Sequence, residues 1–330
     1  MSKELNIKLS KLRSEMLSKA RIKECFHFNK EECDGGVIAA HSVQANGRLS
    51  LLEEEVNKNM RLYSFIEKQI DDFGYTSLKP IGKSQASIFF GFCGYHDKTL
   101  FTDIEDKPFE ENSKTIFLHS YRAFAQTHHT KKEQLRYFID EKEKFTNEEV
   151  EGTEAGVNDG LLVKIQLDRI LKDQSYSDLE YFLYELPKLL PIACSSSYSP
   201  TFTPMSNKPI NMHIDPDVPY QDIFVSVVPD KLGTKVIISC LREHEKCKEY
   251  LDELNEMGDE ELEKTLSAII ILGVENTFIS PWIYTKLSKS EKEALIRELN
   301  YSNIFNPILH FPTSHPKSEL NLFDSKFYKS

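Results

Sequence analysis

The chain has 330 residues, 40% of them hydrophobic and 28% charged, a globular composition that suffices for a packed core and a length that favours two domains. The formal net charge of −11 argues against a protein that coats nucleic acid generally, because phosphate contacts need clustered Lys and Arg, although a local site is compatible with it. No apolar run is long enough for a transmembrane helix, and residues 1–23 lack the apolar core of a signal peptide. We therefore expect a cytoplasmic protein with no membrane partner.

In the first half of the chain, apolar spacing predicts helices before and after a short segment that carries Cys and His. Residues 3–22 fit an amphipathic helix, and a longer helical pattern covers 115–145, with a break near His128. Two runs rich in aromatic and branched residues are strand candidates: 59–66 and 85–92. Residues 147–158 are acidic and contain Gly, so we predict a linker there, followed by a helix over 160–173.

The second half alternates strand and helix patterns. Strands are predicted at three places: 189–196, 222–228 and 235–241, the last two as an antiparallel hairpin. Helices are predicted at three others: 244–256, 259–272 and 288–299. The predicted fold class is therefore α+β. A finger domain embedded in helices would cover 1–150, and a second α+β domain of unknown role, built on a small antiparallel sheet, would cover 151–330.

Four residues in the first hundred have the chemistry and spacing of a metal site. Cys25 and Cys33 form one pair, and Cys93 with His96, three positions later, forms a compact second pair. Zinc prefers four nitrogen or sulfur ligands at the corners of a tetrahedron, and two such pairs supply them. We predict that Cys25, Cys33, Cys93 and His96 bind a structural Zn²⁺ ion.

Two other interpretations of these residues stay open. Seven residues separate Cys25 from Cys33, which exceeds the usual spacing within a zinc loop, so His27 could replace one of them. The thiols could also be ordinary core residues, because unpaired cysteine is among the most buried residue types.

Residues 24–101 resemble the treble-clef finger of the HNH endonucleases. The run 38–44 (IAAHSVQ) is similar to that family's hydrophobic strand, which ends in a His and lies between the two ligand pairs. Ser42 and Gln44 depart from the aliphatic and Pro residues that follow this His in one branch of the family. The run 91–97 (GFCGYHD) matches the second ligand pair and the start of the closing helix. This alignment places Asp97 where the family usually has its last metal-binding residue.

The resemblance implies metal-dependent hydrolysis of phosphodiester bonds in DNA or RNA, in a setting such as prokaryotic defence. His41 would be the general base, and Asp97 would hold a catalytic Mg²⁺ or Mn²⁺ ion, separate from the zinc. The family's middle Asn has no clear counterpart, and Ser87 and Asn59 are the candidates. The alternative is a non-catalytic, zinc-stabilised module that binds a protein or nucleic acid, with His41 itself beside or on the zinc.

Three weaker patterns have simpler interpretations beside the functional ones. Arg122 followed by His128 and His129 resembles the Arg–His motif of the HEPN ribonucleases, on a helix whose other face is apolar. Cys194 precedes three serines, but no Gly-x-Ser-x-Gly elbow surrounds it, which favours a strand that runs into a turn. A second metal site is conceivable at Cys240, His244 and Cys247. We interpret these residues instead as core and surface positions.

Overall fold

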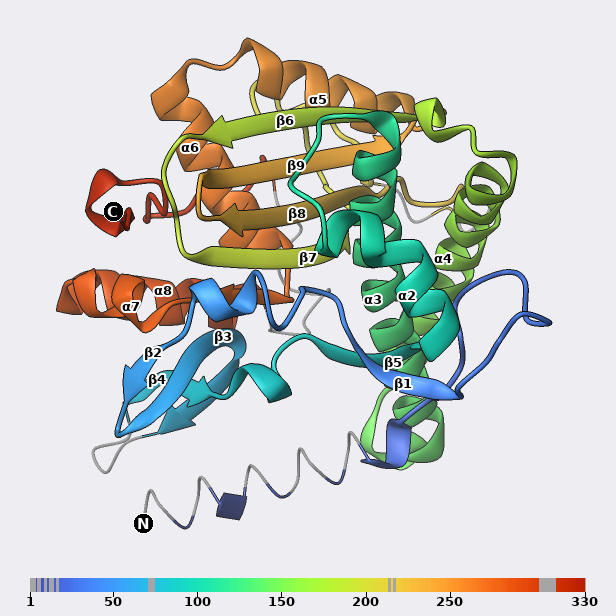
Figure 1. The fold of residues 1–330 in the computed structure, drawn as a ribbon, viewed down its shortest axis with the longest axis horizontal. Helices are drawn as coiled ribbons and strands as arrows, with labels where there is room; N and C mark the ends of the chain where they lie inside the picture. Colours follow the sequence, from blue (N-terminus) through green and yellow to red (C-terminus); the bar gives the residue numbers. More distant parts are fainter. Residues whose placement is uncertain are drawn as a thin grey trace.

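The computed structural model describes residues 18–70, 75–212, 218–302 and 313–329, together with the single positions 4, 7, 8, 11, 15 and 215. The helix predicted over 3–22 falls largely outside these residues. Within them, the chain forms two antiparallel sheets with helices packed around them, as Figure 1 shows, and the predicted α+β class is confirmed. None of the described helices combines the length and apolar character that crossing a membrane requires.

The first half contributes a two-stranded sheet, three strands of a larger sheet and three helices. In chain order they are β1 (Val37–His41), β2 (Glu54–Val56), β3 (Asn59–Ile70), β4 (Thr76–Ile81), β5 (Ile88–Cys93), α2 (Gly94–Glu105), α3 (Ser113–Asp140) and α4 (Asn147–Asp173). The predicted strands 59–66 and 85–92 correspond to β3 and β5. The β1–β5 pair is antiparallel and joins His41 to Ile88 at one end and Val37 to Cys93 at the other.

The linker predicted at 147–158 is wrong, because these residues form the first half of α4. A capping box starts the helix: the Thr146 hydroxyl accepts the Glu149 backbone N–H at 3.2 Å, and the Glu149 carboxylate accepts the Thr146 N–H at 2.8 Å. The break predicted near His128 is also wrong, since α3 continues through it to Asp140.

The second half supplies the remaining strands and a group of shorter helices. They are β6 (Leu179–Leu186), β7 (Ile192–Tyr198), β8 (Ile223–Asp230), β9 (Gly233–Leu241), α5 (Glu245–Glu256), α6 (Asp259–Ala268), a π-helical turn (Ile269–Gly273), β10 (Thr277–Ile279), α7 (Pro281–Lys286) and α8 (Lys289–Ser302). The hairpin predicted from 222–241 is β8–β9, paired antiparallel from Ile223 with Cys240 to Asp230 with Gly233. The predicted helices of this half correspond to α5, α6 with its π-helical extension, and α8.

One eight-stranded antiparallel sheet joins the two halves, in the order β2-β3-β10-β7-β8-β9-β6, with β4 added on β3. The three-residue strand β10 links them, because Phe278 pairs with Ser64 of β3 on one side and with Ala193 of β7 on the other. The sheet therefore takes strands from both sides of residue 150, where the sequence predicts a domain boundary.

Side chains alternate across this sheet and build a core on each face. In β8, Val225 and Val227 face the cluster that includes α5, α6 and the π-helical turn, whereas Phe224 faces α3. Other α3 side chains face β5 and α2: Tyr121 lies against Phe92, and Arg122 stacks over Phe101. Helix α3 is thus held between the large sheet and the small β1–β5 sheet, and this packing fixes the position of the site described next.

Candidate metal centre

The finger that carries the predicted ligands consists of a loop over 21–36, the β1–β5 pair and helix α2 (Figure 1). The loop begins alongside β5. The backbone N–H groups on either side of Cys25 donate to the carbonyls of Phe90, at 3.3 Å, and Gly91, at 2.6 Å. These two hydrogen bonds hold Cys25 beside the end of β5, where Cys93 lies.

The end of the same loop docks on the start of α2. Gly35 and Gly36 have φ values of 73° and 67°, in the left-handed region that Gly adopts without steric cost. This turn lets the Gly36 carbonyl accept the Gly94 N–H at 3.1 Å. Cys33, just before the turn, is thereby brought next to the first turn of α2.

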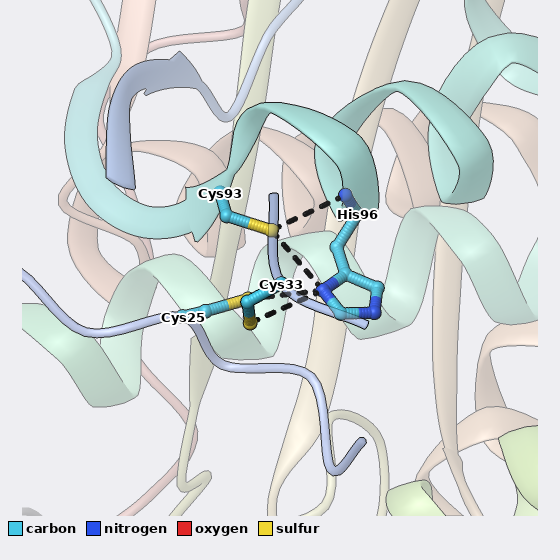
Figure 2. A group of neighbouring side chains, drawn as sticks. All are labelled: Cys25, Cys33, Cys93 and His96. Atoms are coloured by element: carbon cyan, nitrogen blue, oxygen red, sulfur yellow. Dashed lines mark hydrogen bonds between the residues drawn. The ribbon is translucent and has the colours of Figure 1, made fainter. Parts of the chain in front are cut away.

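The predicted ligand atoms converge in one cluster, which Figure 2 shows. The Nδ1 atom of His96 lies 3.5 Å from the sulfur of Cys25, 3.6 Å from that of Cys33 and 3.2 Å from that of Cys93. All four ligand atoms lie within 4.8 Å of one another. Zinc bonds of ~2.3 Å to sulfur and ~2.0 Å to nitrogen at tetrahedral angles would separate S from N by about 3.5 Å. The four residues therefore form a Cys3His group that could hold a metal ion such as zinc.

The local backbone favours thiolate character at Cys93, whereas burial raises the pKa of the Cys33 thiol to about 11. Cys93 ends β5 and caps α2, and its sulfur accepts the His96 backbone N–H at 3.4 Å. Burial opposes ionisation of Cys93, but the backbone N–H groups of His96 and Asp34 hold the pKa of this thiol below its ordinary value. Because three neighbouring thiolates would repel one another, a cation between them relieves the repulsion.

His27 flanks the cluster without joining the three sulfurs. Its ring stacks on that of His96, with centroids 3.9 Å apart and 19° between the planes. Its own Nδ1 accepts the Asn29 N–H at 3.1 Å, which uses that nitrogen within the loop. The Nε2 atom of His96 lies 3.8 Å from the Glu32 carboxylate, which is beyond hydrogen-bond distance.

His41 lies at the end of β1, outside the Cys3His group. Its Nδ1 is 2.9 Å from the Ala86 carbonyl and 3.2 Å from the Ser87 hydroxyl. The carbonyl can only accept, so Nδ1 carries the proton and Nε2 is the basic nitrogen of the neutral ring. Burial lowers the pKa of His41, which favours this neutral form. Ser87 thus contacts His41, whereas Asn59, at the start of β3, donates from its side chain to Asn57.

Asp97 follows His96 in the first turn of α2. Its Oδ1 atom is buried and has no hydrogen-bond partner within the described part of the chain. Burial raises the pKa of this carboxyl, and the positive charge of Arg122 partly offsets the effect. A buried, unpartnered carboxylate oxygen is costly in a protein and marks a position where a cation, a water or a ligand would fit.

An ion pair that the sequence did not indicate lies within electrostatic reach of both His41 and Asp97. Arg122 of α3 donates from Nη2 to Glu105 Oε1 of α2 at 2.7 Å. The Arg122 guanidinium also stacks over the Phe101 ring, 3.9 Å from its centroid. In the sequence, Arg122 stands out only by its spacing from two histidines, and no local pattern marks Glu105 as its partner.

The weaker sequence patterns have structural roles in the described residues. His129 pairs with Glu133 at 3.2 Å, and the ring of His128 stacks on that of Phe124, so these histidines have partners other than Arg122. The remaining candidate residues are buried: Cys194, Cys240, Cys247 and His244. Burial raises the pKa of both Cys194 and Cys240 to about 12, which disfavours a nucleophilic or metal-binding thiolate.

Comparison with protein-family models, with curated proteins and with solved structures gives no match for this chain.

Proposed function

We propose that this chain hydrolyses phosphodiester bonds of DNA or RNA in an HNH-like, metal-dependent manner, with a zinc finger as the scaffold. One observation carries the proposal: the charges of the Arg122–Glu105 ion pair act on both His41 and Asp97. One is a neutral imidazole anchored through Nδ1, and the other is a carboxyl with a buried, unpartnered oxygen. The order of loop, strand pair and helix around the Cys3His group is also the order expected for a treble clef.

In this proposal His41 is the general base. The hydrogen bond from Nδ1 to the Ala86 carbonyl fixes the tautomer and leaves Nε2 as proton acceptor. Burial keeps the ring neutral at pH 7, so Nε2 can take a proton from the attacking water. The Ser87 hydroxyl, 3.2 Å from the same Nδ1, helps to hold the ring in one orientation.

The residues fit two different metals. Three thiols and an imidazole suit zinc, whereas the carboxylate oxygen of Asp97 suits Mg²⁺ or Mn²⁺. A divalent ion at Asp97 would supply polarisation of the scissile phosphate. The unpartnered Oδ1 atom is the feature that fits such an ion, and its place next to His96 ties it to the zinc scaffold.

The second candidate function is a non-catalytic, zinc-stabilised module that binds a protein or nucleic acid. The Cys3His group supports this second function as well as it supports the nuclease, because a structural zinc requires neither His41 nor Asp97. A role in prokaryotic defence belongs to the first candidate alone and rests on association with the HNH family.

A cleavage assay separates the two candidates. Plasmid DNA and a structured RNA are incubated with the purified chain and Mn²⁺, and the wild type is compared with His41→Ala. Loss of a general base lowers the rate by about 100-fold or more, so we expect His41→Ala to be nearly inactive. His244→Gln is the control, because it replaces a histidine far along the chain, a buried one at the start of α5. It should cleave at the wild-type rate.

Equal cleavage by the wild type and His41→Ala rejects the mechanism. Absence of cleavage by the wild type on both substrates, with zinc bound and the fold intact, favours the non-catalytic module.

A further inference from the structure

Arg122 is a buried cation whose hydrogen-bonding capacity is only partly used. Its side chain has a relative exposure of 5%, although it carries five N–H donors. Within the described residues, its hydrogen bond is the one from Nη2 to Glu105, and the buried Nε atom has no partner. Leaving a buried guanidinium donor unpaired is unfavourable, so a purely structural arginine would be expected to satisfy it.

The surroundings of Arg122 indicate what kind of partner would accept a hydrogen bond from its unpaired N–H group. It lines a cavity of about 20 Å³ between α3 and the large sheet, together with Ser42, Gln44 and Arg48. Arg48 already pairs with Asp230, so Arg122 is the arginine there that retains an unpartnered buried donor. Two arginines line this cavity, and the unpartnered Nε donor of Arg122 is complementary to an anion. The cavity itself has room for about one water, so a larger anion would have to approach from the side of Glu105.

Glu105 is the more exposed member of the ion pair. Its side chain is 28% exposed, against 5% for Arg122, so the carboxylate can turn toward water while the guanidinium stays in place. Because the Arg122 guanidinium stacks on the Phe101 ring, it would keep its orientation when the Glu105 carboxylate moves away from it. An incoming phosphate could thus replace Glu105 with a partner of the same charge and similar geometry.

We propose that Arg122 is a substrate-binding residue, which donates hydrogen bonds to the anionic oxygens of the scissile phosphodiester. In the absence of substrate, the Glu105 carboxylate pairs with the same guanidinium. This inference rests on the proposed nuclease function and deepens it. The charge of Arg122 acts on both His41 and Asp97, so a phosphate bound to it would lie in the part of the molecule that holds the proposed base and the proposed metal-binding carboxylate. A rigid guanidinium there also stabilises the charge that develops as water attacks phosphorus.

The test measures binding separately from cleavage. In a His41→Ala background, which prevents turnover, binding of short fluorescein-labelled DNA and RNA is followed by anisotropy over a range of salt concentrations. Arg122→Gln should weaken binding by about 10-fold and reduce the slope of log affinity against log salt by about one. Glu105→Gln should bind more tightly than its parent, because the guanidinium loses a competing carboxylate. The matched control is Arg136→Gln, on an exposed position of the same helix, which should leave both quantities unchanged.

Each result bears on one claim. If Arg122→Gln retains the parent affinity and salt slope while His41→Ala abolishes cleavage, the role of Arg122 is wrong and the nuclease function stands. If the wild type neither binds nor cleaves, the proposed function itself fails. Should Arg122→Gln not fold, Glu105→Gln decides the matter: tighter binding supports the inference, and unchanged or weaker binding overturns it.

Discussion

Asn276 and Ser42 are 234 positions apart in the chain, yet the Asn276 side-chain amide donates to the Ser42 hydroxyl at 2.7 Å. The same amide nitrogen donates to the Ser195 carbonyl, also at 2.7 Å. Ser42 follows His41, and its backbone N–H donates to Ser87, whose hydroxyl contacts the His41 ring. A buried amide next to β10 therefore connects the candidate base, at the end of β1, with strand β7 of the large sheet.

Replacing Asn276 with Ala should destabilise the fold, because it leaves the buried partners of the amide without their hydrogen bonds. We expect a loss of about 1–3 kcal/mol in the free energy of unfolding, measured by urea denaturation. Asn255→Ala is the control: Asn255 is exposed on α5 and donates only to the Leu251 carbonyl. Its effect should stay within about 0.5 kcal/mol. Equal effects of the two substitutions would contradict a structural role for the Asn276 network.

The Cys3His group predicts about one zinc ion per purified chain. Cys93→Ser should remove most of the metal and lower Tm by several degrees, since Cys93 is both a ligand and the cap of α2. Metal content is measured by elemental analysis, and Tm by thermal denaturation with and without a chelator. Cys240→Ser, which alters a thiol in the core of the large sheet, should keep its zinc even if it is less stable. Zinc retained in full by Cys93→Ser would rule out the site.

Two glycines of α4 should respond in opposite ways to replacement by Ala. A Cβ atom on Gly160 would come within 2.4 Å of the Nδ1 atom of buried His128, so Gly160→Ala should cost about 1–3 kcal/mol. A Cβ atom on Gly156, one turn earlier, would meet nothing within 4 Å. Gly156→Ala should stabilise the helix by about 0.5–1 kcal/mol. Urea denaturation of the two variants measures both changes, and a stabilised Gly160→Ala would mean that α3 and α4 do not pack as described.

The linker prediction for residues 147–158 rests on acidic residues together with Gly152 and Gly156. Acidic residues and glycines are typical of a linker, but here the capping box of Thr146 and Glu149 starts a long helix. A Cβ atom on Gly152 or Gly156 would meet nothing within 4 Å, so both glycines lie on an open side of the helix. Local composition cannot distinguish a glycine in a linker from one that a long, well-capped helix tolerates on its open side.

What could be predicted was local in the chain. The spacing of Cys93 and His96 is set by one helical turn, and the hairpin β8–β9 is signalled by two branched strands around a short turn. What could not be predicted depends on tertiary packing. Strand β10 has only three residues, and it is a strand because it pairs with β3 on one side and with β7 on the other. The Arg122–Glu105 pair likewise exists only because α2 and α3 meet.

Stability should fall on acidification, partly through His315. This ring is buried, its Nε2 lies 2.9 Å from the Tyr250 hydroxyl, and burial lowers its pKa to about 4 although Glu253 opposes the shift and Lys317 reinforces it. An unfolded chain binds this proton near pH ~6.5, whereas the folded protein does so only near pH 4. The unfolded state therefore binds more protons between these values, and the stability due to the neutral ring is lost as pH falls through that window.

The size of this effect is up to about 3 kcal/mol, and a comparison of variants isolates it from the other titrating groups. Urea denaturation at about pH 7.5 and about pH 5 is measured for the wild type and for His315→Gln, whose amide can still bond to Tyr250. The variant should lose less stability than the wild type between the two pH values, because it has no imidazole to protonate. Parallel losses would show that His315 titrates normally in the folded protein, and hence that the segment 313–329 does not bury it against α5 as described here.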